Sequence, residues 1–259
     1  MINNGLLEIL MLAQHKADAR LWLHSKRVAC YAVEIAKVLN QSPEFRRRML
    51  LSGLVHDIGF LKIDVDFSQL SIETLLHNDD ELIKQHVLEG VNLLSKILSD
   101  VEILDVVKHH HEKFNGEGFP DQLKGEAISL GARILAVADL YDSMMVGGMS
   151  NSDRAVPESV MHYLGKTASG TILDPIIVNV FLDILQKNAV FYLSPDENDL
   201  HLYKIVYLAP GKLELGDLCD QYGTVLVKQG AELTNHMLGS IRSKYPGQKI
   251  IYVPQSTQK

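Results

Sequence analysis

Apolar residues recur at helical spacing along most of the first 188 residues. The clearest case is residues 20–39, and a shorter helix is expected over residues 1–19. Further helices are expected over residues 43–56, 80–98 and 101–110, and after residue 130. Capping side chains and prolines mark three helix starts: Ser42-Pro43-Glu44, Val156-Pro157-Glu158 and Asp174-Pro175.

Polar or glycine-rich segments separate these helices. They cover residues 64–79, 112–125 and 147–152, and the last is expected to be a mobile loop. After residue 188 the pattern changes to short β-branched or aromatic runs, at residues 190–193, 202–208, 224–227 and 250–253. We therefore expect a mainly α-helical chain with three parts: an N-terminal helix (1–19), a helical domain (20–188) and a small β-rich, α+β module (189–259).

Seven polar side chains fall on the apolar faces or at the ends of the expected helices. Each has an ordinary explanation by itself, because a lone core histidine is usually hydrogen-bonded and an aspartate can cap a helix or face water. Burying all seven together without a metal would leave several polar groups unsatisfied. They come from five helical segments, as in bundles that build metal sites from facing helices. The seven are His24, His56, Asp57, His86, His110, His111 and Asp139.

This combination of residue types predicts transition-metal binding. Imidazole and carboxylate ligands without thiolate suit iron, manganese, cobalt, nickel or zinc. Seven ligands exceed the number that one tetrahedral ion with an open position uses. They fit two ions that share a carboxylate and a bridging water, a device that enzymes use to attack phosphodiesters.

Composition narrows the possible partners. The chain has 259 residues and a formal net charge of −7, which argues against sequence-independent binding of nucleic acid polymers. Its two cysteines, Cys30 and Cys219, lie far apart, so we expect neither a disulfide framework nor a thiolate zinc site. No uncharged apolar stretch approaches the roughly 18 residues of a membrane span, and the N-terminus lacks the cationic start of a signal peptide. We expect a cytoplasmic protein with no membrane segment.

Ordered motifs connect the seven residues to a known family. The most specific motif is His110-His111-Glu112 followed by Asn115-Gly116-Glu117-Gly118-Phe119-Pro120. The other matching pieces are His24-Ser25 with Arg27-Val28, His56-Asp57-Ile58-Gly59, His86 with Gly90, Val137-Ala138-Asp139 and Leu173-Asp174-Pro175. With these motifs in this order, residues 20–187 resemble an HD-GYP domain, a branch of the HD phosphohydrolase superfamily.

The resemblance implies an HD-type helical bundle that hydrolyses cyclic dinucleotides, chiefly cyclic di-GMP, at a centre of two or three metals. It assigns His24, His56, Asp57 and Asp139 to one metal, and Asp57, His86, His110 and His111 to the second. Asp57 would be the bridge, and Asp57 with His56 the catalytic pair. Iron or manganese would be the first choice of metal, with nickel, cobalt or zinc as alternatives. We expect substrate contacts from Lys62, Asn115, Gly116, Gly118, Phe119 and Pro120.

Four positions depart from the family pattern. Phe60 stands where the family usually has a lysine that contacts substrate phosphate, and Phe119 replaces the tyrosine of the GYP signature. Arg20 stands where members with three metals carry a glutamate, so we expect two metals. An arginine-rich segment after Asp139 is missing, and Arg154 is the only arginine close by.

These departures leave three functional hypotheses. The first is a metal-dependent cyclic-dinucleotide phosphodiesterase. The second is a metal-bound domain with weak or no catalysis that senses a cyclic dinucleotide or docks on a partner. The third is an HD phosphohydrolase that acts on another nucleotide. The C-terminal module resembles a small β module found beside some HD-GYP domains, and we expect it to serve docking, homodimerisation or partner binding.

Overall fold

The computed structural model describes residues 13–14, 16–63, 81–146 and 157–187 in the N-terminal part. In the C-terminal part it describes residues 211–212, 217–220, 225–228, 230–234, 236–237, 240 and 250–253. Several predicted features lie outside these ranges: most of the helix expected over 1–19, the segments 64–79 and 147–152, and the strands expected at 190–193 and 202–208. The chain divides into two compact units, residues 1–182 and 183–259. The domain boundary expected after residue 188 stays a prediction.

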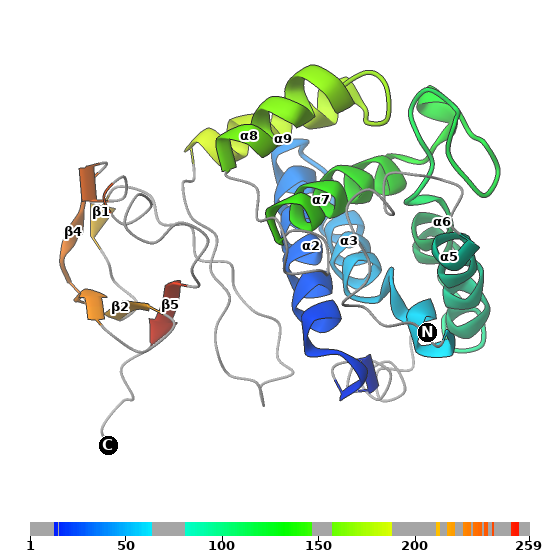
Figure 1. Cartoon of the computed structure of the whole chain (residues 1–259), viewed down its shortest axis with the longest axis horizontal. Coiled ribbons are helices and arrows are strands. Elements are labelled where there is room, and N and C mark those ends of the chain that lie inside the picture. The colour runs from blue at the N-terminus through cyan, green and yellow to red at the C-terminus, as the bar shows by residue number, and fades with distance from the viewer. Residues whose placement is uncertain are drawn as a thin grey trace. The chain divides into compact units, whose positions relative to one another are not determined.

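The described residues before position 188 are mostly helical, which confirms the expected mainly α class (Figure 1). The α-helices are α2 (Ala19–Val38), α3 (Pro43–Val55), α5 (Glu81–Leu94), α6 (Val101–His109), α7 (Leu130–Val146), α8 (Pro157–Tyr163) and α9 (Pro175–Lys187). Shorter turns of helix connect them: the 3₁₀ segments η1 (Ile58–Lys62) and η3 (Gly125–Ala127), and the π-helical segment η4 (Leu164–Ala168). Within the described ranges, no helix is long and apolar enough to cross a membrane.

The helix starts predicted from capping residues are confirmed. The Ser42 hydroxyl accepts a hydrogen bond from the Phe45 amide (3.1 Å), and α3 begins at the next residue, Pro43. The Asp174 carboxylate accepts from the Ile176 amide (2.8 Å), and α9 begins at Pro175. These side chains replace the hydrogen-bond partners that the first turn of a helix lacks.

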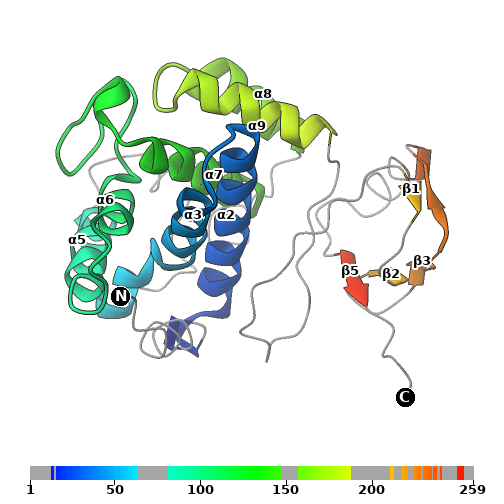
Figure 2. The same ribbon diagram turned by 180° about the vertical axis from the view of Figure 1, so that it is seen from behind.

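Helix packing brings distant parts of the chain together. Helix α2 packs against α3 and α7, and α6 packs against α3, α5 and α7 (Figures 1 and 2). A core cluster fills the space between α2, α3, α5 and α6. It comprises Trp22, Ala29, Leu54, Val55, Ile58, Leu94, Leu98, Ile103 and Val107. Burial of these side chains is the main contribution to the stability of the bundle.

A close backbone contact joins η1 to α5. A Cβ atom added at Gly59 would lie 1.8 Å from the backbone oxygen of His86, so this position accepts only glycine without displacement. Gly90, one turn further along α5, faces the same contact, with its added Cβ 3.4 Å from the Gly59 nitrogen. The contact places the end of α3 directly beside α5.

The second unit contains short antiparallel strands (Figure 1). One sheet has the order β3–β2–β5, formed by β3 (Val225–Val227), β2 (Asp217–Asp220) and β5 (Ile250–Val253). The other pairs β1 (Gly211–Lys212) with β4 (Glu232–Leu233). The strands at 225–227 and 250–253 confirm two predictions. The short strands β1, β2 and β4 were missed, because their sequences carry no alternating apolar pattern.

Candidate metal centre

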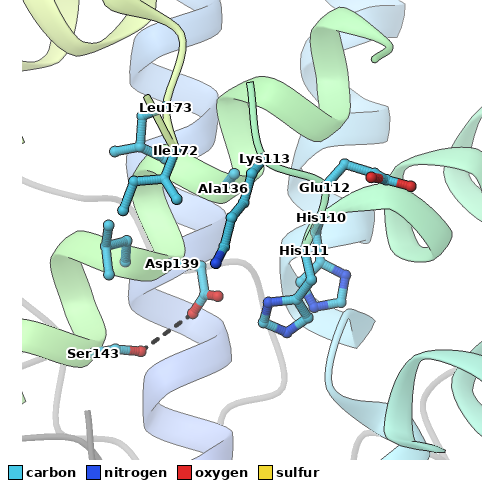
Figure 3. A pocket seen from close by; sticks show the side chains of 10 residues that line it. His110, His111, Glu112, Lys113, Ala136, Asp139, Ser143, Ile172 and Leu173 are labelled. Carbon is cyan, nitrogen blue, oxygen red and sulfur yellow. Dashed lines mark hydrogen bonds between the residues drawn. The ribbon is translucent and has the colours of Figure 1, made fainter. Parts of the chain in front are cut away.

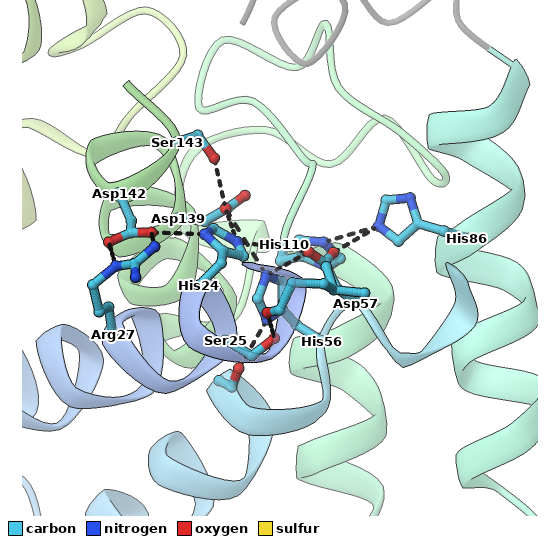
Figure 4. Close-up of polar contacts among 12 residues, drawn as sticks. His24, Ser25, Arg27, His56, Asp57, His86, His110, Asp139, Asp142 and Ser143 are labelled. Carbon is cyan, nitrogen blue, oxygen red and sulfur yellow. Dashed lines mark hydrogen bonds and ion pairs between the residues drawn. The ribbon is translucent and has the colours of Figure 1, made fainter. Parts of the chain in front are cut away.

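The first group of candidate ligands combines residues from α2 and the end of α3. His24, His56 and Asp57 are buried, and each offers one ligand atom within 4.8 Å of the others. The Asp57 Oδ2 atom lies 3.6 Å from His24 Nε2 and 3.3 Å from His56 Nε2. Three potential ligand atoms therefore converge on one point within the bundle (Figure 4).

Backbone carbonyls set the orientation of two imidazoles. Nδ1 of His56 lies 2.9 Å from the Gly53 carbonyl, and Nδ1 of His110 lies 2.7 Å from the Val107 carbonyl. A carbonyl only accepts, so each Nδ1 carries the proton and each Nε2 of the neutral ring presents a lone pair. Nε2 of His56 is buried and makes no hydrogen bond within the described part of the chain. A buried nitrogen lone pair of this kind is the donor that a metal requires.

His24 is oriented by a carboxylate instead. Its Nδ1 lies 2.8 Å from Asp142 Oδ2, and Arg27 holds the same carboxylate through Nε and a terminal nitrogen at 2.6 and 2.8 Å. The arrangement leaves His24 Nε2 facing Asp139 Oδ1 at 3.1 Å. Carboxylate–histidine pairs of this type fix the tautomer and raise the basicity of a metal-ligating imidazole. Ser143 donates a hydrogen bond to Asp139 (3.3 Å), which helps to hold the second carboxylate.

The second group of candidate ligands contains three histidines. His86 from α5, with His110 and His111 from the end of α6, offers ligand atoms that also lie within 4.8 Å of one another. The Nε2 atoms of His86 and His110 are 3.4 Å apart. Two aromatic rings flank the group: Phe60 stacks on His86 with centroids 4.3 Å apart, and Phe119 stacks on His111 at 5.2 Å.

Asp57 lies between the two groups. Its Oδ2 atom faces His24 and His56, whereas its Oδ1 atom lies 3.3 Å from His86 Nε2. Asp139 is nearest to the first group, 3.1 Å from His24 Nε2 and 3.9 Å from His56 Nε2. The structure thus brings all seven predicted residues into one region, with Asp57 between the two groups.

His24 and the three-histidine group differ in their affinity for protons. Burial lowers the pKa of His24, but hydrogen bonds and charge from Asp139 and Asp142 outweigh it and raise the pKa to about 10. Burial and the neighbouring imidazole of His86 lower the pKa of His111 to about 3. Burial and neighbouring imidazoles also lower the pKa values of His86 and His110 well below the ordinary histidine value. The three-histidine group is therefore neutral near pH 7, the state in which imidazole binds metals.

Burial and neighbouring groups also shift the pKa values of the carboxylates. Burial raises the pKa of Asp57, although the nearby imidazoles oppose this. Burial alone would also raise the pKa of Asp139, but hydrogen bonding and charge from His24 lower it overall. Arg27 and His24 lower the pKa of Asp142 in spite of its burial. Carboxylates close to the neutral three-histidine group suit divalent cations, whose charge they would compensate. The residues present therefore fit a metal centre.

The residues predicted to contact substrate lie in two places. Lys62 is exposed at the end of η1. Asn115, Gly116 and Gly118 belong to the loop after α6, where Asn115 hydrogen-bonds to Glu117 (2.8 Å). Phe119 is buried against His111, and its peptide bond to Pro120 is cis. Their contact with a substrate stays a prediction. The side chain of Arg20, on which the expectation of two metals rests, lies outside the described set.

A pocket opens beside the centre (Figure 3). Its volume is about 60 Å³, and the predicted substrate-contact residues are not among those that line it. The lining residues are His110, His111, Glu112, Lys113, Ala136, Asp139, Leu140, Ser143, Ile172 and Leu173. The sequence reasoning missed Lys113 and Ser143 in this role.

Sequence reasoning also missed the part that Arg27 and Asp142 play. A signal existed, because each lies three residues after a predicted ligand on the same helix: Arg27 after His24, and Asp142 after Asp139. Residues at this spacing are neighbours on a helix surface. His109 lies apart from the seven, with its two ring nitrogens 2.8 Å from Asp105 and 3.1 Å from Asp121.

The chain is similar to known proteins in sequence and in fold. The HD domain family model matches residues 9–176. A cyclic di-GMP phosphodiesterase of Thermotoga maritima is 28% identical over 198 residues, which cover 75% of this chain and 53% of that protein. The 3'3'-cGAMP-specific phosphodiesterase 1 of Vibrio cholerae is 30% identical over 197 residues, which cover 72% of this chain and 43% of that protein. A crystal structure of a cyclic GMP-AMP specific phosphodiesterase of V. cholerae matches the fold with a TM-score of 0.56 at 18% identity, covering 73% of this chain and 50% of that one.

The helical bundle and the gathered His and Asp side chains define a domain of the HD type. The chain belongs to the HD domain family, whose model covers most of the helical part. The recognition of this family from the sequence motifs is thereby confirmed. The chain spans about half the length of the curated relatives it matches.

Proposed function

We propose that the helical domain is a metal-dependent phosphodiesterase that opens cyclic dinucleotides, with cyclic di-GMP as the first substrate to test. One observation carries the proposal: Asp57 directs one oxygen to His24 and His56 and the other to His86. A carboxylate in this position supports a dinuclear centre. The names of the related phosphodiesterases support the choice of a cyclic dinucleotide as substrate.

Two divalent ions would fit the seven residues. His24, His56, Asp57 and Asp139 would hold one, and Asp57, His86, His110 and His111 would hold the other. Histidine and carboxylate ligands suit iron, manganese, nickel, cobalt or zinc. The resemblance to HD-GYP domains makes iron or manganese the first choice. When bound, such a pair supplies a water of lowered pKa and a positive charge for the phosphate oxygens.

The chain's own residues would prepare this chemistry. Asp142 holds His24 with Nε2 directed into the centre, and the Gly53 carbonyl does the same for His56. Because Asp57 and its imidazole neighbours are buried, competing water is limited and electrostatic interactions are stronger than in solvent. His56 and Asp57 would be catalytic in the sense that they position the reacting groups through the metals.

The substrate would be a small phosphorylated molecule. The net charge of −7 disfavours a nucleic acid polymer, whereas a local metal pair attracts an isolated phosphodiester. We place Lys62 and the loop residues Asn115, Gly116, Gly118, Phe119 and Pro120 as substrate contacts. The cytoplasm, where reduced metals and nucleotide signals occur together, is the proposed compartment. The β-rich module at residues 189–259 would serve dimerisation or a protein partner.

Metal loading followed by product analysis tests the proposal. The purified protein is loaded anaerobically with iron or manganese and incubated with cyclic di-GMP, 3'3'-cGAMP and a panel of other nucleotides. We expect conversion of a cyclic dinucleotide to a linear dinucleotide, with about two metal ions per chain by elemental analysis. Absence of turnover of both cyclic dinucleotides with every metal would refute the proposal. Turnover of a different nucleotide alone would favour the wider HD phosphohydrolase hypothesis.

The position of Phe60 favours a second candidate function. The ring is 3% exposed and stacks on His86, so this position offers no cation to a substrate phosphate. A domain that retains its metals but has lost such a contact could sense the cyclic dinucleotide without hydrolysing it. Calorimetry would then detect micromolar binding without product. Equal binding by an Asp57→Ala variant would show that the metals take no part.

A further inference from the structure

One cation reaches into the pocket beside the three-histidine group. Lys113 is the only lysine or arginine among the residues that line this pocket. Its side chain extends from the loop after His111 towards Asp139 (Figure 3). The charge of Lys113 also lowers the pKa of His111, in addition to the larger effects of burial and of His86.

The glycine-rich loop holds the backbone of Lys113 in place. The Gly116 amide donates to the Lys113 carbonyl at 2.7 Å, which closes a tight turn. A Cβ atom added at Gly118 would lie 2.2 Å from the backbone nitrogen of Lys113. The loop therefore packs against this residue more closely than any side chain other than that of glycine allows. The amides of Phe114 and Asn115 then donate to carbonyls of the segment before α9, at 3.0 and 2.8 Å. The starting point of the lysine side chain is therefore fixed before any ligand arrives.

In the described structure, the arginines near the centre do not line this pocket. Arg27 pairs with Asp142, and Arg133 pairs with Asp174 at 2.5 Å. Position 60 carries a buried phenyl ring instead of a cation. Among the described residues that line the pocket, Lys113 is therefore the one that carries a positive charge.

We propose that Lys113 binds a phosphate oxygen of the substrate in the pocket next to the metal centre. The ammonium group is a compact charge with three donors, suited to a phosphate whose other oxygens face the metals. Hydrogen bonds to ionised groups are stronger than neutral ones, and partial burial strengthens them further. This assignment rests on the proposed function for the identity of the substrate, and on the pocket for the phosphate contact itself.

Phosphate titration of metal-loaded protein tests the contact. The full chain is loaded with manganese, and inorganic phosphate is titrated by calorimetry into the wild type, Lys113→Met, Lys113→Arg and Lys96→Met. Lys96 is exposed in the turn after α5 and serves as the matched control. We expect Lys113→Met to weaken phosphate binding by about tenfold or more, as the loss of a charged hydrogen bond requires. Lys113→Arg should retain most of the affinity, and Lys96→Met should behave as wild type.

Parallel measurements separate this proposal from the proposed function. Metal content by elemental analysis should be the same in all four proteins, and KM for cyclic di-GMP should rise in Lys113→Met. Wild-type affinity for phosphate in Lys113→Met, absence of saturable phosphate binding by the wild type, or loss of metal in Lys113→Met would each overturn the assignment. A wild-type protein that turns over no cyclic dinucleotide, yet binds phosphate through Lys113, would refute the proposed function and support the phosphate contact.

Discussion

Asp57 Oδ1 lies 3.3 Å from His86 Nε2, although the two residues belong to different helical segments. The other oxygen of Asp57 faces His56 Nε2, also at 3.3 Å. One carboxylate therefore contacts both groups of candidate ligands. This relationship depends on the close approach of η1 to α5 at Gly59, because that contact determines how near His86 lies to the end of α3.

Replacement of Asp57 by asparagine should disrupt the whole centre. The amide keeps the shape of the side chain but removes the negative charge that two cations would share. We expect metal content to fall from about two ions per chain to one or fewer, with turnover reduced by at least about a hundredfold. Elemental analysis and product chromatography measure the two effects. The control is Asp105→Asn, which alters a carboxylate bound to His109 outside the centre. Full metal content in Asp57→Asn would contradict the bridging role.

Asp142 should act on the centre without contacting a metal. Its carboxylate holds Nδ1 of His24 and is itself held by Arg27. An Asp142→Asn variant should bind metal about 10- to 100-fold more weakly, because His24 loses its orienting charge. Competition with a chelator measures this affinity without reference to turnover. An Arg27→Lys variant should lose less, since a cation remains beside the carboxylate. Unchanged metal affinity in Asp142→Asn would show that the pair serves stability alone.

The contact between η1 and α5 can be tested with two glycines. Gly59→Ala would place a methyl group 1.8 Å from the His86 carbonyl oxygen, and the backbone must move to relieve this. We expect a loss of about 2 to 3 kcal/mol in the free energy of unfolding, together with weaker metal binding. Gly90→Ala is the matched control, because its methyl group would meet the nearest atom at 3.4 Å and alanine favours a helix. Chemical denaturation of both variants gives the comparison. Equal stability of the two would contradict the proposed packing.

Acid should destabilise the metal-free protein. Histidines in the unfolded chain titrate near 6.5, whereas burial and neighbouring imidazoles lower the pKa of His111 to about 3 and those of His86 and His110 well below the ordinary value. Between these values the unfolded state binds protons that the folded state does not, so stability falls as the pH drops below 6.5. His24 acts in the opposite direction, since its pKa of about 10 contributes stability that is lost as the pH rises from 6.5 towards 10. The raised pKa of Asp57 also opposes acid destabilisation, but we expect the three histidines to outweigh these two groups.

Thermal unfolding in the presence of a chelator measures the balance. We expect the melting temperature of the metal-free protein to be lower at about pH 5 than at about pH 7.5, by roughly 5 °C or more. A rise in melting temperature on acidification would show that His24 dominates. With metal present, the affinity should increase with pH, because protons compete with the ions for the imidazole nitrogens.

A lysine at position 60 should not restore a substrate contact. Phe60 packs with Leu21, Ile83, Val87 and Phe119 and stacks on His86. Phe60→Lys would remove this packing and place an ammonium group in an apolar cluster, at a cost of about 3 to 5 kcal/mol in unfolding free energy. Phe60→Leu, which keeps an apolar side chain, should cost less. Chemical denaturation measures the stability of both variants, and product analysis measures their turnover. Raised turnover in a stable Phe60→Lys protein would show that the lysine side chain reaches the substrate.

Much of the fold and of the candidate site followed from sequence. The helical period and the caps at Ser42 and Asp174 were sufficient to place helices, because these signals act between neighbouring residues. The candidate ligands could be named because histidines and aspartates on apolar helix faces require polar partners. The short strands β1 and β2 were missed, since pairing with distant strands rather than local pattern determines them.

The sequence by itself determined which histidines and aspartates are candidate ligands, because residue type and helical spacing are local properties. Only the tertiary structure decided how Asp57 divides its two oxygens between His56 and His86, since that depends on the packing of α5 against η1. Packing likewise placed Phe60 against an imidazole and turned Lys113 into the pocket. Distances between side chains on different helices follow from how the helices pack, and no local pattern records them.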